Sequence, residues 1–217
     1  AVIIEPIQGE SGILPATQEY LQAARRLCDK HGALLILDEV QTGMGHTGKL
    51  FAYEHYGITP DILSSAKALG GGFPIGAILT TDKIAPTFGP GTHGSTFGGN
   101  PMACAVGSRA FDIINAPETL AHVEKQGQKF QTTLRELGEK TGVFKEVRGM
   151  GLLIGCVLAD KYQGRASEIT AAALKHGLMV LVAGSDVVRF APSLLLNDED
   201  MAEGLKRLEA ALTEWIV

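Results

Sequence analysis

The chain is poor in the features that mark several protein classes. Its three cysteines, Cys28, Cys104 and Cys156, are widely spaced and form no CxxC pair. Such spacing argues against a disulfide framework or a cysteine zinc site, and it is typical of a reducing compartment such as the cytoplasm. Lysine and arginine (19) are outnumbered by aspartate and glutamate (24), so the net charge is −5. Without a basic run, neither a nucleic acid nor an anionic membrane is an expected partner.

Long apolar runs and several common catalytic motifs are also missing. The longest apolar stretch, near 151–159, is far too short to cross a bilayer, and no secretory signal is visible. The sequence has no HExxH and no GxSxG motif, and its six histidines are not spaced to share a metal, so no metal site is expected. What the chain has in excess is glycine, 27 residues, often clustered where backbone must approach something closely.

Short apolar runs alternate with amphipathic segments in the first half. Strands are predicted at 2–4, 34–37, 62–63 and 75–79, and helices at 17–30, 49–56 and 102–114. Strands that are apolar throughout and separated by helices indicate an α/β fold with a mostly parallel sheet, covered on both faces. Ligands bind such sheets beyond the carboxyl ends of the strands. Glu5, Asp38 and Lys67 each follow a predicted strand at such an end.

The pattern changes at Asn115-Ala116-Pro117, which we take as a domain boundary. We expect residues 1–115 to be the second half of a large α/β domain and residues 116–217 to be a smaller α+β domain. The elements expected there are a helix to about 140, strands at 144–147 and 152–157, a helix at 167–176, strands at 179–181 and 187–190, and a last helix capped by Asn197.

Residues 43–48 match the dinucleotide motif GxGxxG, and with Lys49 and Leu50 they nearly match a phosphate-binding P-loop. Five residues from Asp38 separate the motif from its strand, however, and Leu50 lacks the hydroxyl that would hold Mg²⁺. A glycine-rich turn is the better interpretation. Nucleotide binding stays a distant alternative.

Asp38 and Lys67 form a more specific combination. Lys67 lies in a turn of small residues followed by three glycines, so it can project into a cavity, where a desolvated amine can form a Schiff base. A carboxylate on a neighbouring strand end could keep a pyridine nitrogen protonated. Pyridoxal phosphate chemistry requires both groups. Taken alone, a surface lysine and an unrelated aspartate would explain the two residues better, because most lysines are exposed.

The motifs around Asp38 and Lys67 favour the functional interpretation over the structural one. The chain resembles a class III pyridoxal-phosphate aminotransferase of fold type I over essentially all its length, and within that class most closely the acetylornithine and succinylornithine aminotransferases. The motifs that carry the resemblance are residues 5–10 (EPIQGE), 37–43 (LDEVQTG), 60–76 (PDILSSAKALGGGFPIG), 91–101 (GTHGSTFGGNP), 149–156 (GMGLLIGC) and 187–192 (VVRFAP).

The resemblance implies a role for each residue that matches these motifs. Lys67 would carry pyridoxal 5′-phosphate as a Schiff base and then transfer protons, and Asp38 would pair with the pyridine nitrogen. Glu39 belongs to the same cofactor-binding run, in which Val40 would pack on a ring face and Gln41 would reach the 3-oxygen. These assignments rest on the family pattern.

The remaining implied roles concern substrate and subunit partner. Thr96 would bind the cofactor phosphate in the neighbouring subunit of a homodimer with shared active sites, and Ser95 would contact substrate. Arg189 would grip the α-carboxylate of glutamate or 2-oxoglutarate, because a planar guanidinium suits a carboxylate. Glu10 would pair with Arg189 while the amino donor is bound and release it when 2-oxoglutarate arrives.

Two departures from the family pattern are visible. His46 stands where the family commonly has arginine. The chain also opens at Ala1 as if a strand were already under way, so we expect it to be the C-terminal part of a longer protein whose missing segment supplies a phosphate cradle, a ring-stacking aromatic residue and an arginine.

The expected activity is transfer of the distal amino group of N-acetylornithine or N-succinylornithine to 2-oxoglutarate, in two ping-pong half-reactions. Two alternatives stay open. One is another ω-aminotransferase, acting on ornithine or 4-aminobutyrate. The other is a non-catalytic remnant of this fold that serves as a binding module.

Overall fold

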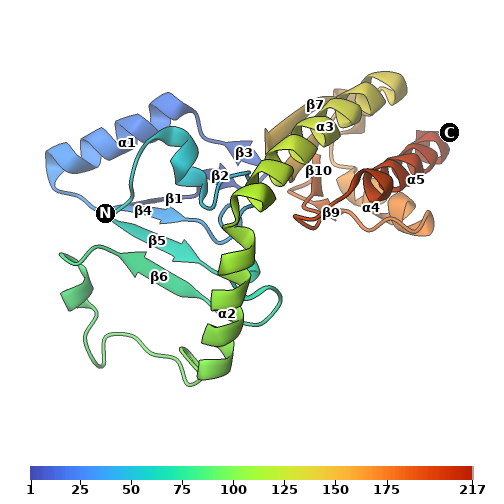
Figure 1. The fold of residues 1–217 in the computed structure, drawn as a ribbon. Helices are drawn as coiled ribbons and strands as arrows, with labels where there is room; N and C mark the ends of the chain where they lie inside the picture. Colours follow the sequence, from blue (N-terminus) through green and yellow to red (C-terminus); the bar gives the residue numbers. More distant parts are fainter. Residues whose placement is uncertain (217) are drawn as a thin grey trace. The chain divides into compact units, whose positions relative to one another are not determined.

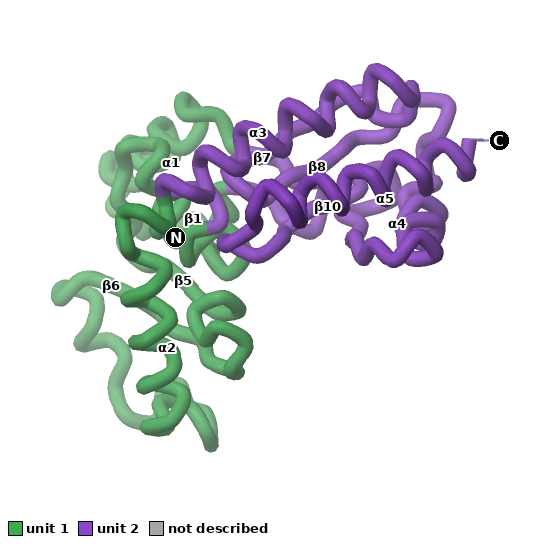
Figure 2. Tube along the Cα trace, turned by 45° about the vertical axis from the view of Figure 1, so that its right-hand side comes forward, with its two compact units in different colours: residues 1–6, 16–45, 49–120 green, residues 7–15, 46–48, 121–217 purple. Residues whose placement is uncertain are grey.

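The computed structural model describes residues 1–216, which form two compact units (Figure 2). Unit 1 comprises residues 1–6, 16–45 and 49–120. Unit 2 comprises residues 7–15, 46–48 and the described residues from 121 onward, so it includes two segments from early in the sequence. The domain boundary expected after Asn115 stays a prediction.

Unit 1 is built on a four-stranded sheet in the order β1-β4-β5-β6 (Figure 1). The strands are β1 (Val2–Ile4), β4 (Leu35–Asp38), β5 (Ile62–Ser65) and β6 (Ala77–Thr80). The first three run parallel, and β6 joins β5 antiparallel. The expected mostly parallel α/β sheet is therefore confirmed, with one antiparallel strand at its edge.

The helices of unit 1 begin and end at residues whose chemistry favours those positions. In α1 (Gln18–His31), the Thr17 hydroxyl accepts a hydrogen bond from Tyr20 N at 3.2 Å, and Gly32 ends the helix in a left-handed conformation. The other helical segments are η1 (Ala52–Tyr56), η2 (Lys67–Gly70), η3 (Ala85–Thr87) and α2 (Pro101–Ile114). The helix expected at 49–56 is shorter than predicted and is a 3₁₀ helix, as its five residues are too few for two α-helical turns.

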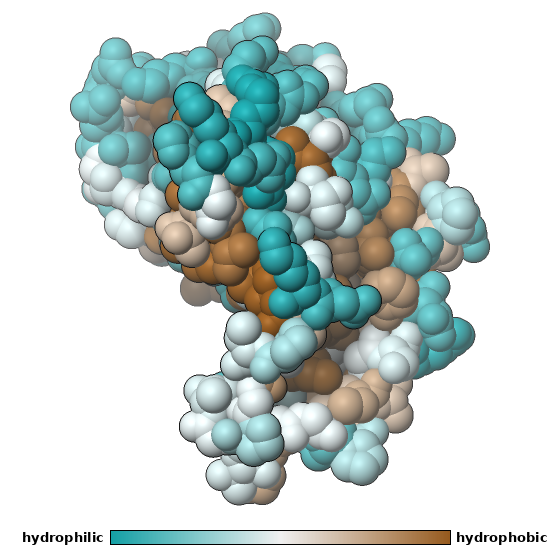
Figure 3. All heavy atoms as spheres, turned by 90° about the vertical axis from the view of Figure 1, so that its left-hand side faces the viewer, coloured by the Kyte–Doolittle hydropathy of each residue, from teal (hydrophilic) through white to brown (hydrophobic). Residues whose placement is uncertain are grey.

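Both edge strands of the unit 1 sheet carry exposed apolar side chains. Ile3 on β1 is 68% exposed and Ile78 on β6 is 61% exposed. Apolar surface is visible on the face of the molecule shown in Figure 3. Charged residues, prolines or bulges, which commonly protect a sheet edge, do not occupy these two strands.

Unit 2 contains an antiparallel sheet in the order β7-β8-β10-β9. Its elements are α3 (Pro117–Thr141), β7 (Phe144–Met150), β8 (Leu153–Leu158), η4 (Asp160–Tyr162), α4 (Ala166–Lys175), β9 (Leu181–Val182), β10 (Val187–Phe190) and α5 (Asp198–Ile216). Asn197 caps α5 as expected, because its Oδ1 accepts from Asp200 N at 2.8 Å. No helix in the described part of the chain has both the length and the apolar character that crossing a bilayer requires.

Every residue of β8 is buried because both faces of the strand are covered. Ile154 and Cys156 pack into a large core with residues of α3, α4 and α5. Leu153 and Val157, on the opposite face, pack with residues of a small hairpin. That hairpin consists of β2 (Ile7–Gln8) and β3 (Leu14–Pro15). The sequence did not predict it.

We expect a glycine-to-alanine substitution to have opposite effects on stability at two helical glycines of unit 2. A Cβ on Gly127 of α3 would overlap the backbone of Gly151, whereas a Cβ on Gly204 of α5 would meet only Leu178 Cδ1, at 3.7 Å. We expect Gly127→Ala to lower the free energy of unfolding by about 1–3 kcal/mol through overpacking. Gly204→Ala should raise it by about 0.5–1 kcal/mol through helix propensity. Urea denaturation of the two variants checks this, and equal effects would contradict the close packing of α3 at Gly151.

Candidate active site

The carboxyl ends of β4 and β5 bring together two of the residues predicted to be catalytic. Asp38 is the last residue of β4 and is paired in register with Ser64 of β5. Because the two strands are parallel and adjacent, both end at the same edge of the sheet. Lys67 comes two residues after the end of β5 and begins η2. The carboxylate and the amine are thus carried by neighbouring strand ends.

The backbone around Lys67 is unusual for a lysine. Its φ is 49°, in the left-handed region, while Ala66 before it is extended with φ −158°. The turn continues through Gly71 and Gly72, whose φ values of 56° and 105° suit glycine. A non-glycine residue in this region costs about 1–2 kcal/mol, and such residues cluster at functional sites. Lys67 itself is exposed.

The backbone amides of the turn after β4 donate hydrogen bonds to β5 and within the turn. Val40 N donates to Asp38 Oδ1 at 3.0 Å, and Glu39 N donates to Ser64 O at 3.0 Å. Gly43 N closes the turn on Glu39 O at 3.0 Å. These bonds fix the backbone that carries Asp38, Val40 and Gln41, all three of which are partly exposed.

Glu39 points inward and is 1% exposed. Its Oε2 accepts from Thr42 Oγ1 at 2.8 Å and from Ala52 N at 2.7 Å, and its Oε1 accepts from Tyr53 N at 2.8 Å. Burial raises the pKa of Glu39, and these hydrogen bonds oppose the rise. The buried carboxylate therefore joins the turn after β4 to the start of η1.

Burial and the nearby charge of Glu39 together raise the pKa of Tyr56 to about 12. Its hydroxyl donates to Pro6 O at 3.3 Å. Tyr56 is therefore a neutral packing residue of unit 1 at any ordinary pH. Thr42 was not singled out in the sequence, although the Glu39-x-x-Thr42 spacing is one that lets two side chains meet across a turn.

Residues Ser95 and Thr96 lie on the loop that precedes α2, and both are exposed. Ser95 Oγ accepts from Gly98 N at 3.1 Å, which closes a local turn. The expectation that Thr96 serves a neighbouring subunit stays a prediction. His46 is partly buried, and its carbonyl accepts from Leu152 N at 2.9 Å within unit 2. The glycine-rich segment around it forms turns and bends, as expected.

Arg189 and Glu10 both belong to unit 2, where the structure brings them together. Arg189 Nη1 lies 2.7 Å from Glu10 Oε1. The arginine side chain is 12% exposed, whereas that of Glu10 is 68% exposed. The mostly buried arginine side chain belongs to β10, and the carboxylate reaches it from the loop between β2 and β3. The roles expected of this pair stay predictions.

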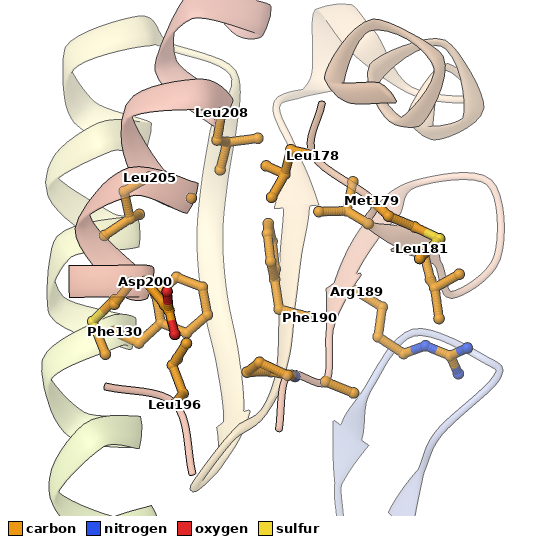
Figure 4. Close-up of a pocket in the computed structure, with 15 residues that line it drawn as sticks. Phe130, Leu178, Met179, Leu181, Arg189, Phe190, Leu196, Asp200, Leu205 and Leu208 are labelled. Carbon is orange, nitrogen blue, oxygen red and sulfur yellow. The ribbon is translucent and has the colours of Figure 1, made fainter. Parts of the chain in front are cut away.

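A cavity of about 290 Å³ opens beside β10 (Figure 4). Its walls are mostly hydrocarbon, including Phe130, Leu178, Leu205 and Leu208. In Figure 4 the Arg189 side chain runs from β10 toward the pale blue ribbon of the β2–β3 hairpin. The cavity can hold an apolar group, but it offers no acid–base pair for catalysis. Among residues 1–216, no three His, Cys, Asp or Glu side chains are placed to hold a metal ion.

The fold and these strand ends match one family. The model of the family "Aminotransferase class-III" matches residues 1–212. The chain belongs to the class III aminotransferases. It is 82% identical over 215 residues to acetylornithine aminotransferase from Neisseria meningitidis serogroup B, a match that covers 99% of this chain and 54% of the relative.

Solved structures give the same result. N-acetylornithine aminotransferase from Stenotrophomonas maltophilia matches with a TM-score of 0.92 and 47% identity, over 99% of this chain and 56% of that one. Ornithine aminotransferase from Toxoplasma gondii, with partial occupancy of PLP at its active site, matches with a TM-score of 0.91 and 35% identity, over 99% of this chain and 51% of that one. These likenesses confirm the expected fold class. The chain spans about half the length of the relatives it matches.

The hydrogen bonds of Glu39 predict a pH-dependent stability. Glu39→Gln puts an amide NH₂ where one oxygen now accepts, so we expect a loss of about 1–3 kcal/mol in the free energy of unfolding. Because the pKa of Glu39 is raised above its ordinary value of 4.5 by folding, the wild-type contribution is largest below pH 4.5 and declines as pH rises through the folded pKa. The deficit of the variant should therefore widen as pH is lowered.

Glu54→Gln is the matched control. Glu54 Oε1 accepts from Phe51 N at 2.9 Å, and a glutamine oxygen can accept the same bond. We expect a change below about 0.5 kcal/mol in the free energy of unfolding. Urea titrations between pH 4.5 and 8 measure both variants. A Glu39 variant that matches the control at every pH would show that the buried carboxylate does not hold the turn.

Proposed function

We propose that the protein containing this chain is a pyridoxal-phosphate-dependent aminotransferase. It moves the distal amino group of N-acetylornithine, or of N-succinylornithine, to 2-oxoglutarate and yields the semialdehyde and glutamate. The observation that carries the proposal is the placement of Asp38 and Lys67 on adjacent parallel strand ends. Family membership and the 82% identity to an acetylornithine aminotransferase support it.

The residues present fit pyridoxal phosphate. Its ring nitrogen calls for a carboxylate and its aldehyde for a primary amine, and Asp38 and Lys67 supply these two groups. The cofactor, when bound, supplies an electron sink for the charge left on the substrate carbon. Lys67 would hold the cofactor through Nζ. The same amine would take the proton from the carbon that bears the transferred amino group.

Asp38 would keep a proton on the pyridine nitrogen, because an adjacent carboxylate favours the cationic form of the ring. Val40 and Gln41 follow on the same turn, where Val40 would pack on a ring face and Gln41 would reach the 3-oxygen. Glu39 acts differently from its neighbours. Its buried carboxylate accepts hydrogen bonds from Thr42 and from the backbone of η1, so it stabilises the turn after β4 and does not face the ligand.

Unit 2 supplies the group that recognises a carboxylate. Arg189 binds the α-carboxylate of 2-oxoglutarate or glutamate through its planar guanidinium. Glu10 neutralises Arg189 while the acylated amino donor is bound, and it gives way when 2-oxoglutarate arrives. Without Glu10, a mostly buried cation would face an uncharged chain, which is unfavourable.

We further propose a homodimer in which Thr96 binds the cofactor phosphate of the neighbouring subunit and Ser95 contacts the substrate there. Both side chains are exposed on the loop before α2, as a contact with another subunit requires. A cytoplasmic location fits the cysteines, since Cys28, Cys104 and Cys156 are all free.

The assignment of Lys67 predicts a covalent link that one substitution removes. In the full-length protein, borohydride reduction should fix the cofactor to the wild type, detected as an increase in intact mass. Lys67→Ala should show no such increase and should lose the visible absorbance of the bound cofactor. Lys49→Ala, at another exposed lysine of unit 1, should behave as the wild type. Undiminished labelling of Lys67→Ala would refute the assignment.

One alternative substrate is favoured by a specific likeness, the ornithine aminotransferase structure. Single-turnover reduction of the bound cofactor by N-acetylornithine, ornithine and 4-aminobutyrate separates these possibilities. We expect N-acetylornithine to be fastest by at least roughly tenfold, a difference of about 1.4 kcal/mol in transition-state binding. A faster reaction with ornithine would reassign the substrate. Absence of any cofactor spectrum in the full-length protein would favour a non-catalytic binding module.

A further inference from the structure

Three residues form a row across the sheet of unit 2. Arg148 of β7 is paired with Gly155 of β8, and Gly155 is paired on its other side with Arg189 of β10. Directly opposed residues of antiparallel strands project from the same face. Two arginine side chains therefore flank a position on β8 that has no side chain.

The vacant position on Gly155 is filled by Ile13. A Cβ on Gly155 would lie 2.9 Å from Ile13 Cβ and 3.0 Å from Val187 Cγ1, too close for any larger residue. Ile13 is fully buried, although its φ of 51° lies in the left-handed region that a β-branched residue rarely adopts. Its conformation must be imposed by its surroundings, of which the sheet face at Gly155 is one part.

Arg148 is the second group that holds the conformation of this loop. Its Nε and Nη2 both donate to Gly12 O, at 3.0 Å and 2.7 Å. Gly12 has φ 113°, and a Cβ on it would lie 2.9 Å from Arg148 Nη2. Arg148 thus holds the loop between β2 and β3 at the carbonyl of Gly12. The next residue, Ile13, packs against the backbone of Gly155, where there is no side chain in its way.

The other end of the same loop carries Glu10, whose Oε1 lies 2.7 Å from Arg189 Nη1. The Glu10 side chain is 68% exposed, and an ion pair with so exposed a partner contributes little by itself. The carboxylate reaches Arg189 because the loop is already fixed. In Figure 4 the Arg189 side chain extends toward that hairpin.

We propose that Arg148 is a positioning residue that sets substrate preference, by holding residues 9–13 in the conformation in which Glu10 covers Arg189. This inference rests on the proposed roles of Glu10 and Arg189. A dicarboxylate must displace Glu10 from Arg189, whereas the acylated amino donor needs the pair intact. Loosening the loop therefore weakens the donor half-reaction and spares or assists the 2-oxoglutarate half-reaction.

The test uses the full-length holoenzyme and measures the two half-reactions separately by single-turnover absorbance. We expect Arg148→Met to lower kcat/KM for the amino donor by roughly five- to tenfold and to leave that for 2-oxoglutarate within about twofold or raise it. Arg148→Lys keeps a cation that can donate one bond, so its effect should be intermediate. Lys145→Met is the matched control on the same strand, where Lys145 pairs with Asp160 and not with the loop, and it should change neither half-reaction.

A readout independent of activity is hydrogen exchange of the backbone amides of residues 9–13. Exchange should be faster in Arg148→Met than in the wild type or in Lys145→Met, because the bonds to Gly12 O are lost. Unchanged exchange in these residues would overturn the proposal. So would an equal loss in both half-reactions, which is the mark of a general structural role.

A double-mutant cycle shows whether Arg148 acts through Glu10. In the Glu10→Gln background, Arg148→Met should not change the ratio of the two half-reactions further. A full additional effect of Arg148→Met there would contradict the proposal. If Glu10→Gln alone leaves the ratio unchanged, the switch role of Glu10 fails. The proposed cofactor chemistry at Lys67 is tested separately by its covalent labelling.

Discussion

The parallel pairing of β4 with β5 is the constraint on which the proposed chemistry depends. In that register Asp38 is opposite Ser64, so the next few residues of both strands emerge at one edge of the sheet. A shift of one residue would turn Asp38 to the other face of the sheet. The left-handed backbone at Lys67 then redirects the chain, so that an amine follows the strand within a short turn. Register and turn together would offer the proposed cofactor both an acid and an amine.

In each unit, a polar side chain binds the backbone of a segment that carries residues of the proposed site. Glu39 is buried behind the turn after β4 and binds two backbone amides of η1. Arg148 binds one backbone carbonyl of the loop that carries Glu10. Both groups satisfy backbone atoms that a turn leaves without helix or sheet partners. Glu39 and Arg148 thus act on backbone atoms next to residues that are proposed to touch ligands.

The sequence predicted well what periodicity and strand ends can report. Short apolar runs marked β1, β4 and β5, and the polar residues that follow them led to the hypothesis that Asp38 and Lys67 share a site. It did not predict the β2–β3 hairpin, because Ile7–Gln8 and Leu14–Pro15 are two-residue strands that contain neither an apolar run nor an alternating pattern. It could not show that Glu39 points inward, since Asp38 and Glu39 are adjacent acidic residues and the partners that bury Glu39, Ala52 and Tyr53, lie further along the chain. The sequence also could not predict that Gly155 leaves room for Ile13, because the two residues are far apart in the chain and meet only in the fold.

The most direct test of the central claim is ¹⁵N NMR of the full-length protein loaded with pyridoxal phosphate labelled at the ring nitrogen. A carboxylate at the end of β4 should hold that nitrogen protonated in the wild type, and Asp38→Asn should shift its resonance to that of the neutral pyridine. The account predicts this change at constant cofactor occupancy. A ring nitrogen in the same protonation state in both proteins would contradict it.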